Sequence, residues 1–293
     1  MPVALRYFRR FNRQQLAEGQ RAVPGSVGYL GDEGALTVYN PGDPLPSGAV
    51  WDGDAFRVDA SGFTLERFLI RAEVVSYGAN PTFRQGVIEC GSGTTFGITV
   101  NGSGLGVLTV EDVTVRRSPP ATSGDVQTNG ISSDSALVAR RCDVSGSGDG
   151  IHVVAGGGSL VSQCVIHDLA FVDEEQHLDP IQVFSGAGGA ITVEHCWVGP
   201  AFSAGGTPPN SSLTCGFATN SGPIITPTIH NNYFASGLYH LRVGYRVTGA
   251  VVTGNDLGSL SPGEFGLVSV TEPSSVATWS GNRDGGGQTI PQP

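Results

Sequence analysis

The sequence contains few charged residues and no lysine. Charged side chains make up 14% of the 293 positions, and all 16 basic residues are arginines. The 26 acidic side chains outnumber them, and the net charge of -10 disfavours nucleic acid as the main partner. Apolar runs are also short. None approaches the roughly 18 residues of a membrane-spanning helix, so we expect no membrane insertion.

Cysteine is present, but not in the close pairs that zinc ribbons and disulfide frameworks use. The five residues are an odd number with wide spacing: Cys90, Cys142, Cys164, Cys196 and Cys215. We therefore assign no metal ligand and expect no cofactor. The first residues, MPVALRYFRRFNRQQL, lack the apolar run of a secretory signal, which favours synthesis in a cytoplasm.

Glycine and proline are abundant. The 44 glycines and 18 prolines make up about 21% of the chain, which argues against a helical protein. An eight-residue phrase recurs from residue 63 onward: apolar, any, apolar, two of any type, a small or polar anchor, any, apolar. Its copies read FTLERFLI, LTVEDVTV, LVARRCDV, SLVSQCVI, ITVEHCWV, PTIHNNYF, AVVTGNDL and ATWSGNRD, with a weaker copy, QGVIECGS. The corresponding anchors are Phe68, Val113, Cys142, Cys164, Cys196, Asn232, Asn255 and Asn282, with Cys90 for the weaker copy.

A second phrase alternates with the first and is centred on an apolar residue. These centres are Ile98, Ile131, Ile151, Ile181, Phe217, Leu241 and Leu267. Two strands per turn, separated by Gly, Pro, Asn or Asp, indicate a β-solenoid in which equivalent residues stack about 4.8 Å apart. The inward column is then expected to contain Leu65, Val110, Val161, Val193, Ile229 and Val252.

The rung phrases resemble those of a known fold family. ITVEHCWV and PTIHNNYF, with QHLDPIQVF at 176–184 and the sequence His167-Asp168-Leu169, are similar to the right-handed parallel β-helix of the pectate-lyase-like superfamily. More narrowly, they resemble β-helix domains in minor tail proteins of phages that infect actinobacteria. The resemblance implies an all-β, right-handed parallel β-helix in a virion tail. It also implies a homotrimer, with other tail proteins and host-envelope glycans as partners.

The ends of the chain differ from the repeats. Residues 5–20 are basic and place Leu5, Phe8 and Leu16 on one stripe, which predicts a short helix that either caps the solenoid or docks on a partner protein. We therefore divide the chain into a basic N-terminal helix or anchor, a turn-rich lead-in and cap, the parallel β-helix, and a flexible tail. Their ranges are 1–24, 25–62, 63–284 and 285–293.

Candidate ligand-binding residues follow the apolar centre of the second phrase. Ser132, His152 and Gln182 are expected to form an exposed polar stripe, which Arg242 continues farther along the rod. Asp149 and Asp179 precede the apolar centres by two positions and are expected to lie one rung apart. That spacing would suit a retaining glycosidase, in which these two carboxylates would be catalytic.

An acidic run lies beside this stripe. Its candidate ligand-binding residues are His167, Asp168 and His177. Three interpretations stay open: a solvated acidic loop, saccharide binding, and either glycoside cleavage or a calcium site. The function we expect is that of a phage tail structural and adhesion protein that contacts host glycans. The alternatives are a polysaccharide hydrolase or lyase, or a tail component with no ligand.

Overall fold

A computed structural model gives the arrangement of most of the chain. It describes residues 17, 19–91, 94–117, 129–154, 157–169, 179–184, 188–199, 211–217, 224–235, 239–258, 266–272 and 275–293, with the backbone alone for 211–217. Among these residues no helix is long and apolar enough to cross a membrane. A 3-10 turn, η2, lies at Glu33–Ala35.

Short strands make up nearly all of the regular structure. They are β1 Thr37–Tyr39, β2 Ala49–Asp52, β3 Ala55–Val58, β4 Thr64–Glu66, β5 Phe68–Ile70, β6 Val74–Ser76, β7 Thr82–Cys90, β8 Phe96–Val100, β9 Val107–Arg117, β10 Asn129–Ser133, β11 Ala136–Arg140, β12 Asp143–Ser145, β13 Asp149–Val153, β14 Ser159–Ser162, β15 Val165–His167, β16 Ile181–Phe184, β17 Gly189–Glu194, β18 Trp197–Val198, β19 Ser211–Phe217, β20 Ile225–His230, β21 Tyr233–Phe234, β22 Tyr239–Val243, β23 Ala250–Thr253, β24 Asp256–Leu257, β25 Val268–Val270, β26 Val276–Ser280 and β27 Arg283–Asp284.

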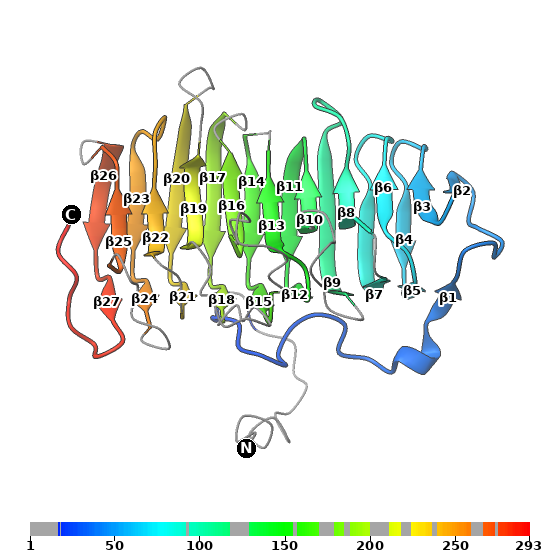
Figure 1. Cartoon of the computed structure of the whole chain (residues 1–293), viewed down its shortest axis with the longest axis horizontal. Helices are drawn as coiled ribbons and strands as arrows, with labels where there is room; N and C mark the ends of the chain where they lie inside the picture. The colour runs from blue at the N-terminus through cyan, green and yellow to red at the C-terminus, as the bar shows by residue number, and fades with distance from the viewer. Residues whose placement is uncertain are drawn as a thin grey trace.

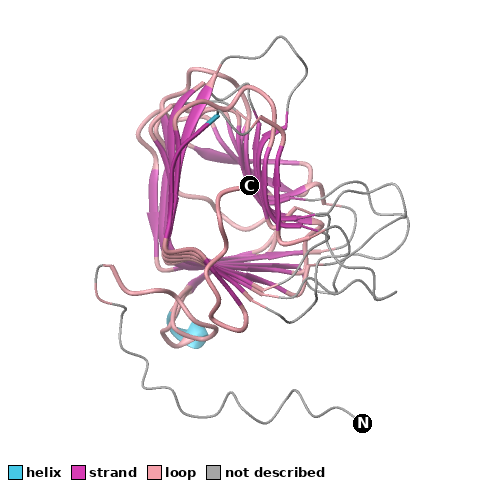
Figure 2. Cartoon of the chain, turned by 90° about the vertical axis from the view of Figure 1, so that its left-hand side faces the viewer, coloured by secondary structure: helices cyan, strands magenta, loops and turns pink. Residues whose placement is uncertain are grey.

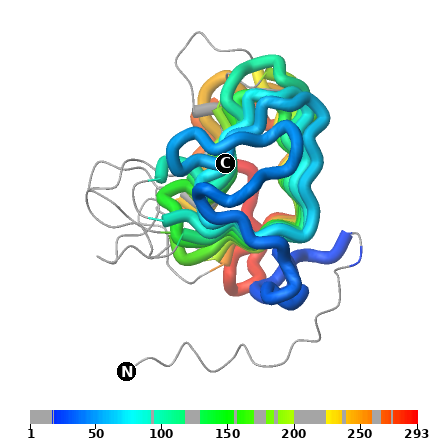
Figure 3. Tube along the Cα trace, turned by 90° about the vertical axis from the view of Figure 1, so that its right-hand side faces the viewer, coloured from blue at the N-terminus to red at the C-terminus, as the bar shows by residue number. Residues whose placement is uncertain are grey.

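The strands form a parallel β-helix with three faces (Figures 1 and 2). A 17-stranded sheet provides two of them, because each rung bends within it. The first face holds β4, β11, β14, β17, β20, β23 and β26 with the first parts of β7 and β9; the second face holds the strands that follow each bend. A ten-stranded sheet, from β2 to β25, is the third face. Viewed along the rod, the rungs superimpose (Figure 3).

The bend between the first and second faces is a single residue with positive φ. Successive rungs place Asp112, Arg141, Gln163, His195 and Asn231 there, with φ between 50° and 55°. The residue after the bend is the anchor of the eight-residue phrase. Because this one-residue bend repeats in each rung, the anchors stack inside the coil. The register of the first-face strands confirms the expected inward column.

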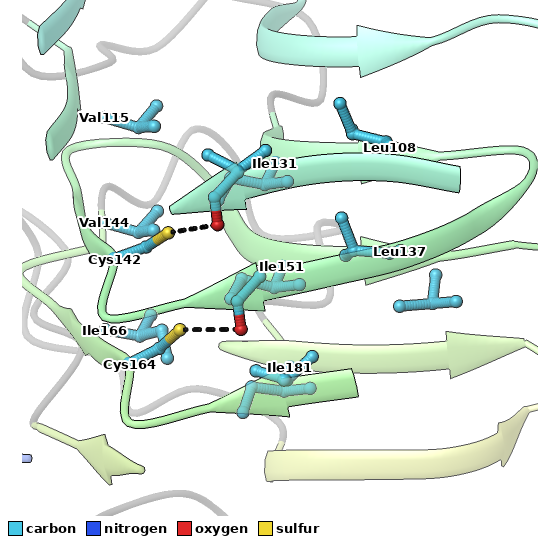
Figure 4. Close-up of a cluster of buried hydrophobic side chains, with 14 of the residues drawn as sticks. Leu108, Val115, Ile131, Leu137, Cys142, Val144, Ile151, Cys164, Ile166 and Ile181 are labelled. Carbon is cyan, nitrogen blue, oxygen red and sulfur yellow. Dashed lines mark hydrogen bonds between the residues drawn. The ribbon is translucent and has the colours of Figure 1, made fainter. Parts of the chain in front are cut away.

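Cysteine and asparagine anchors make equivalent hydrogen bonds to the backbone. The side chain of each donates to a backbone carbonyl oxygen in the preceding rung, three residues before the anchor of that rung. Cys164 Sγ thus contacts Ala139 O at 3.6 Å, and Asn232 Nδ2 contacts Val193 O at 2.9 Å. Figure 4 shows the Sγ atoms of Cys142 and Cys164 directed at such carbonyls within the aliphatic core. Burial raises the pKa of the Cys142 thiol. The four described cysteines are therefore free thiols buried in the core.

One anchor differs from the sequence prediction. Cys90 aligns with Arg117 at the end of a strand, and the anchor of this rung is Gly86, which pairs with Val113. The reason is steric, because a Cβ on Gly86 would lie 2.6 Å from the ring of Phe68 in the preceding rung. The large Phe68 anchor fills the slot that the next anchor would occupy.

Two centres of the third face are also displaced. Ile181 pairs with Leu213 rather than Phe217, and Leu241 pairs with Val268 rather than Leu267. Both errors occur where apolar residues are close enough to offer two alternating patterns.

The N-terminal segment lies along the outside of the second face. We call residues 19–36 the N-terminal strap. The amide of Ala22 donates to His195 O at 2.8 Å, and that of Gly28 donates to Arg141 O at 2.8 Å, so the strap crosses several rungs before β1 joins β5. Ala22 and Val27 pack against Val165. The helix expected over residues 5–20 falls mainly on residues 1–16 and 18, outside the described residues.

Both ends of the coil are covered by chain. Strands β1 and β3 pair with β5 and β6, so residues expected in the lead-in already belong to the two sheets. The C-terminal residues, expected to be a flexible tail, instead fold back over the last rung, as Figure 2 shows. There Trp279 Nε1 donates to Ile290 O at 2.8 Å and Ile290 packs against the core. An apolar side chain at this place removes the open core end from water.

Candidate functional site

The polar row on the third face has the register expected from the sequence. Ser132 pairs with His152 and His152 with Gln182, and the row continues through Thr214 to Arg242. These five residues come from β10, β13, β16, β19 and β22 and therefore lie side by side along the rod.

The exposure expected for this row is wrong. Ser132 is 4% exposed and Gln182 is 6% exposed, while His152 and Arg242 are partly buried. Gln182 is held by a hydrogen bond from its Nε2 to Asp179 Oδ2 at 2.9 Å. The row consequently offers little polar surface to a large ligand.

His152 lies in an unusually apolar setting for a surface histidine. Its ring meets Phe184 edge-on with centroids 4.8 Å apart. Neither ring nitrogen has a hydrogen-bond partner among the described residues. Burial lowers the pKa of His152 to about 4, so the imidazole is neutral near pH 7.

Asp149 and Asp179 lie one rung apart, as expected. Both are fully buried, and Asp149 Oδ1 accepts a hydrogen bond from the backbone N–H of Asp179 at 2.8 Å. The adjoining Gly150 is required, because a Cβ there would lie 2.4 Å from Pro180 O. The Asp149 carboxyl therefore accepts from a backbone N–H and the Asp179 carboxyl accepts from Gln182 Nε2, so both groups hold the structure of this corner.

His167 is clamped between two carboxylates. Its Nε2 lies 2.9 Å from Asp143 Oδ1 and its Nδ1 lies 2.7 Å from Asp168 Oδ2. Burial alone lowers the pKa of His167, but the hydrogen bonds to Asp143 and Asp168 outweigh it and raise the pKa to about 10. The hydrogen bond from His167 lowers the pKa of Asp168. This group fastens β15 to β12. The other histidine expected here, His177, lies outside the described residues.

A more open polar surface lies on the first face. A hollow of about 420 Å³, which we call the first-face hollow, opens over strands β11, β14 and β17 beside the strap. It is lined by Gly19, Arg140, Arg141, Ser162, Gln163, Glu194 and His195. Arg141 is paired with Glu111 and Asp112, each at 2.7 Å. Arginine, carboxylate and imidazole groups thus converge on one accessible recess, whereas Ser162 and Gln163 are buried.

At one end of the hollow, Glu194 joins two histidines. Glu194 and His230 are register neighbours on β17 and β20, and their Oε2 and Nε2 atoms are 2.7 Å apart. His195 occupies the positive-φ bend, and its ring meets that of His230 at 5.1 Å. Burial lowers the pKa of His195 despite the nearby Glu194 carboxylate. One ligand atom from each of the three residues lies within 4.8 Å of the others.

This recess was not predicted from the sequence. Its residues occupy the position two before each anchor: Arg140 before Cys142, Ser162 before Cys164, and Glu194 before Cys196. That outward position could have been followed in the same way as the third-face row.

Comparison with protein-family models, curated proteins and solved structures gives no match. The function therefore has to be argued from the fold and its surfaces.

Proposed function

We propose that this chain is a structural and adhesion protein of a phage tail, and that its β-helix binds glycans of the host envelope. The tail assignment rests on the resemblance of the rung phrases to those of actinobacterial phage tail proteins. The observation that carries the glycan-binding part is the first-face hollow, where the exposed Arg140 guanidinium, the partly exposed Glu194 carboxylate and the partly exposed His195 imidazole converge. Sugar hydroxyls both donate and accept hydrogen bonds, so such a mixed set of groups suits them.

The hollow replaces the third-face row as the proposed contact surface. Ser132 and Gln182 are too buried to contact a polymer, whereas Arg140 is exposed and Glu194 is partly exposed. A recess lined by three neighbouring rungs offers several contacts to an extended polysaccharide.

The alternative, a polysaccharide-degrading enzyme, finds less support. A glycosidase needs both carboxyl groups at the scissile bond, and Asp149 and Asp179 have no exposed surface. Their hydrogen bonds to Asp179 N–H and Gln182 keep them within the wall of the coil.

Attachment to the particle is assigned to residues 1–16, which precede the strap. The strap itself is fastened to the coil: Arg21 Nε donates to Asn231 O at 2.9 Å, and Gln163 Nε2 donates to Gln20 O at 3.0 Å. These contacts hold Gln20 and Arg21 on the coil, so the proposed attachment lies before them in the chain. A homotrimer remains part of the proposal and follows from the resemblance.

The test is binding of the purified protein to envelope polysaccharide from an actinobacterial host. Arg140→Ala should weaken binding about tenfold or more, because a charged hydrogen bond contributes about 1.5–3 kcal/mol. Arg84→Ala is the matched control: Arg84 lies in the same outward row but outside the hollow, paired with Glu111 at 3.4 Å. Equal binding by the two variants would refute the hollow as the site. Release of reducing ends that is abolished by Asp149→Asn would favour the enzyme instead.

A further inference from the structure

We propose that Glu194, His195 and His230 form a binding site for a divalent transition-metal ion of the Zn²⁺ class. The inference does not depend on glycan binding, since it rests on the positions of these three side chains alone. Their ligand atoms lie within 4.8 Å of one another, at the end of the first-face hollow.

The backbone fixes two of the ligands relative to each other. Glu194 and His230 are paired in neighbouring strands, and the amide of His195 donates to His230 O at 3.2 Å. His195, the residue after Glu194, has positive φ and forms the bend between the first and second faces. The ligands therefore come from adjacent rungs of a rigid sheet, which favours a defined metal geometry.

The donor set indicates the class of ion. Two imidazole nitrogens and one carboxylate oxygen suit Zn²⁺ and related ions, whereas Ca²⁺ requires six to eight oxygen ligands. A zinc ion lies about 2.0–2.2 Å from such ligands, so small side-chain rotations bring the three atoms around it. Coordination through His230 Nε2 would replace its contact with Glu194 Oε2, with the imidazole proton on Nδ1.

Neighbouring side chains support the ligands. Ser162 Oγ donates to Glu194 Oε1 at 2.9 Å, which leaves Oε2 for the ion. The Asn231 side-chain amide lies 3.2 Å from His230 Nδ1. With the amide flipped, Asn231 Oδ1 accepts a hydrogen bond from His230 Nδ1–H, which is the support that a metal-bound imidazole needs. Glu194 and His195 also line the hollow, so the remaining coordination positions face water or a ligand.

Isothermal titration of the full-length chain with Zn²⁺ tests the proposal, with the visible absorption of Co²⁺ as a second readout of the ligand set. We expect Glu194→Gln and His230→Gln to weaken Zn²⁺ binding at least about tenfold, since even the loss of a supporting residue costs about 10- to 100-fold. Both substitutions are close in size to the native side chain. Unchanged urea unfolding of the variants would establish that they fold.

The controls separate this site from other histidines. His167→Gln removes the histidine between Asp143 and Asp168, and His177→Gln removes the one in the acidic run. Both should bind Zn²⁺ as the wild type does. The proposal is overturned if His230→Gln keeps wild-type affinity, if His177→Gln loses it instead, or if the wild type binds no Zn²⁺.

Discussion

Replacing Asn255 by alanine should destabilise the rod far more than a surface change does. Asn255 Nδ2 donates to Ile229 O at 2.9 Å and to Asn282 Oδ1 at 3.0 Å. Its Oδ1 accepts from the N–H and the Nδ2 of Asn232, each at 3.0 Å. Asn255 is 1% exposed, so water does not replace these four hydrogen bonds. At about 1 kcal/mol for each, the free energy of unfolding should fall by about 4 kcal/mol.

The assay is urea unfolding followed by far-UV circular dichroism, comparing both the midpoint and the slope because long repeat arrays can unfold in parts. Asn231→Gly is the matched control. Asn231 occupies the adjacent bend with φ 55°, where the next rungs have Gly254 and Gly281, so glycine fits there without strain. It should change the free energy of unfolding by less than about 0.5 kcal/mol. A loss below about 1 kcal/mol for Asn255→Ala would refute the reasoning, since the side chain would then not bridge the rungs.

Three further predictions concern other parts of the coil. Gly86→Ala should lower the free energy of unfolding in urea by about 1–3 kcal/mol, because the added Cβ would meet the Phe68 ring. Adding Phe68→Leu to the same chain should recover part of this loss. No recovery in the double variant would count against the steric explanation. The folded-state pKa of His167 is raised from 6.5 to about 10, so its contribution to stability is present below about pH 6.5 and is lost as pH rises toward 10. The wild type should therefore lose more stability than His167→Gln over that range, and parallel pH profiles would contradict the clamp. Removing residues 285–293 should lower Tm and shift the emission of Trp279 to the red, and an unchanged spectrum would mean that Ile290 does not cover the last rung.

The sequence was sufficient for the fold because the solenoid repeats its packing in every rung. Alternation of inward and outward residues identifies Val110, Val161 and Val193 as one column. Because the rungs stack in parallel, residues at the same position of successive repeats are neighbours in space. The change from cysteine to asparagine anchors does not interrupt the ladder, because both side chains donate to the equivalent backbone carbonyl of the preceding rung.

The wrong predictions of anchors and strand centres fall where two nearby residues fit the same local pattern. The residue type of Cys90 predicts an anchor there, although the volume of Phe68 requires glycine at position 86. Phe217 fits the alternating pattern of the second phrase, but Leu213, which fits it too, is the residue that pairs with Ile181. Register in such places is decided by contacts between rungs, which no single phrase contains.

Exposure was the least predictable property. Outward phase alone does not make a residue accessible, since Gln182 is bound by Asp179 and Ser132 is buried. The first-face hollow depends on the strap, whose Gly19 lies beside residues more than a hundred positions later. A local reading of the repeats does not include that contact.

Distances between spin labels along one outward row test the stacking of rungs most directly. Arg84 lies in the same row of the first face as Glu194 and Thr253, four and six rungs away. Labels on cysteines at Arg84 and Glu194, and at Arg84 and Thr253, should be separated by about 19 Å and about 29 Å, an increase of about 4.8 Å per rung. Separations that do not grow with the number of rungs would contradict the parallel β-helix and every site placed on it.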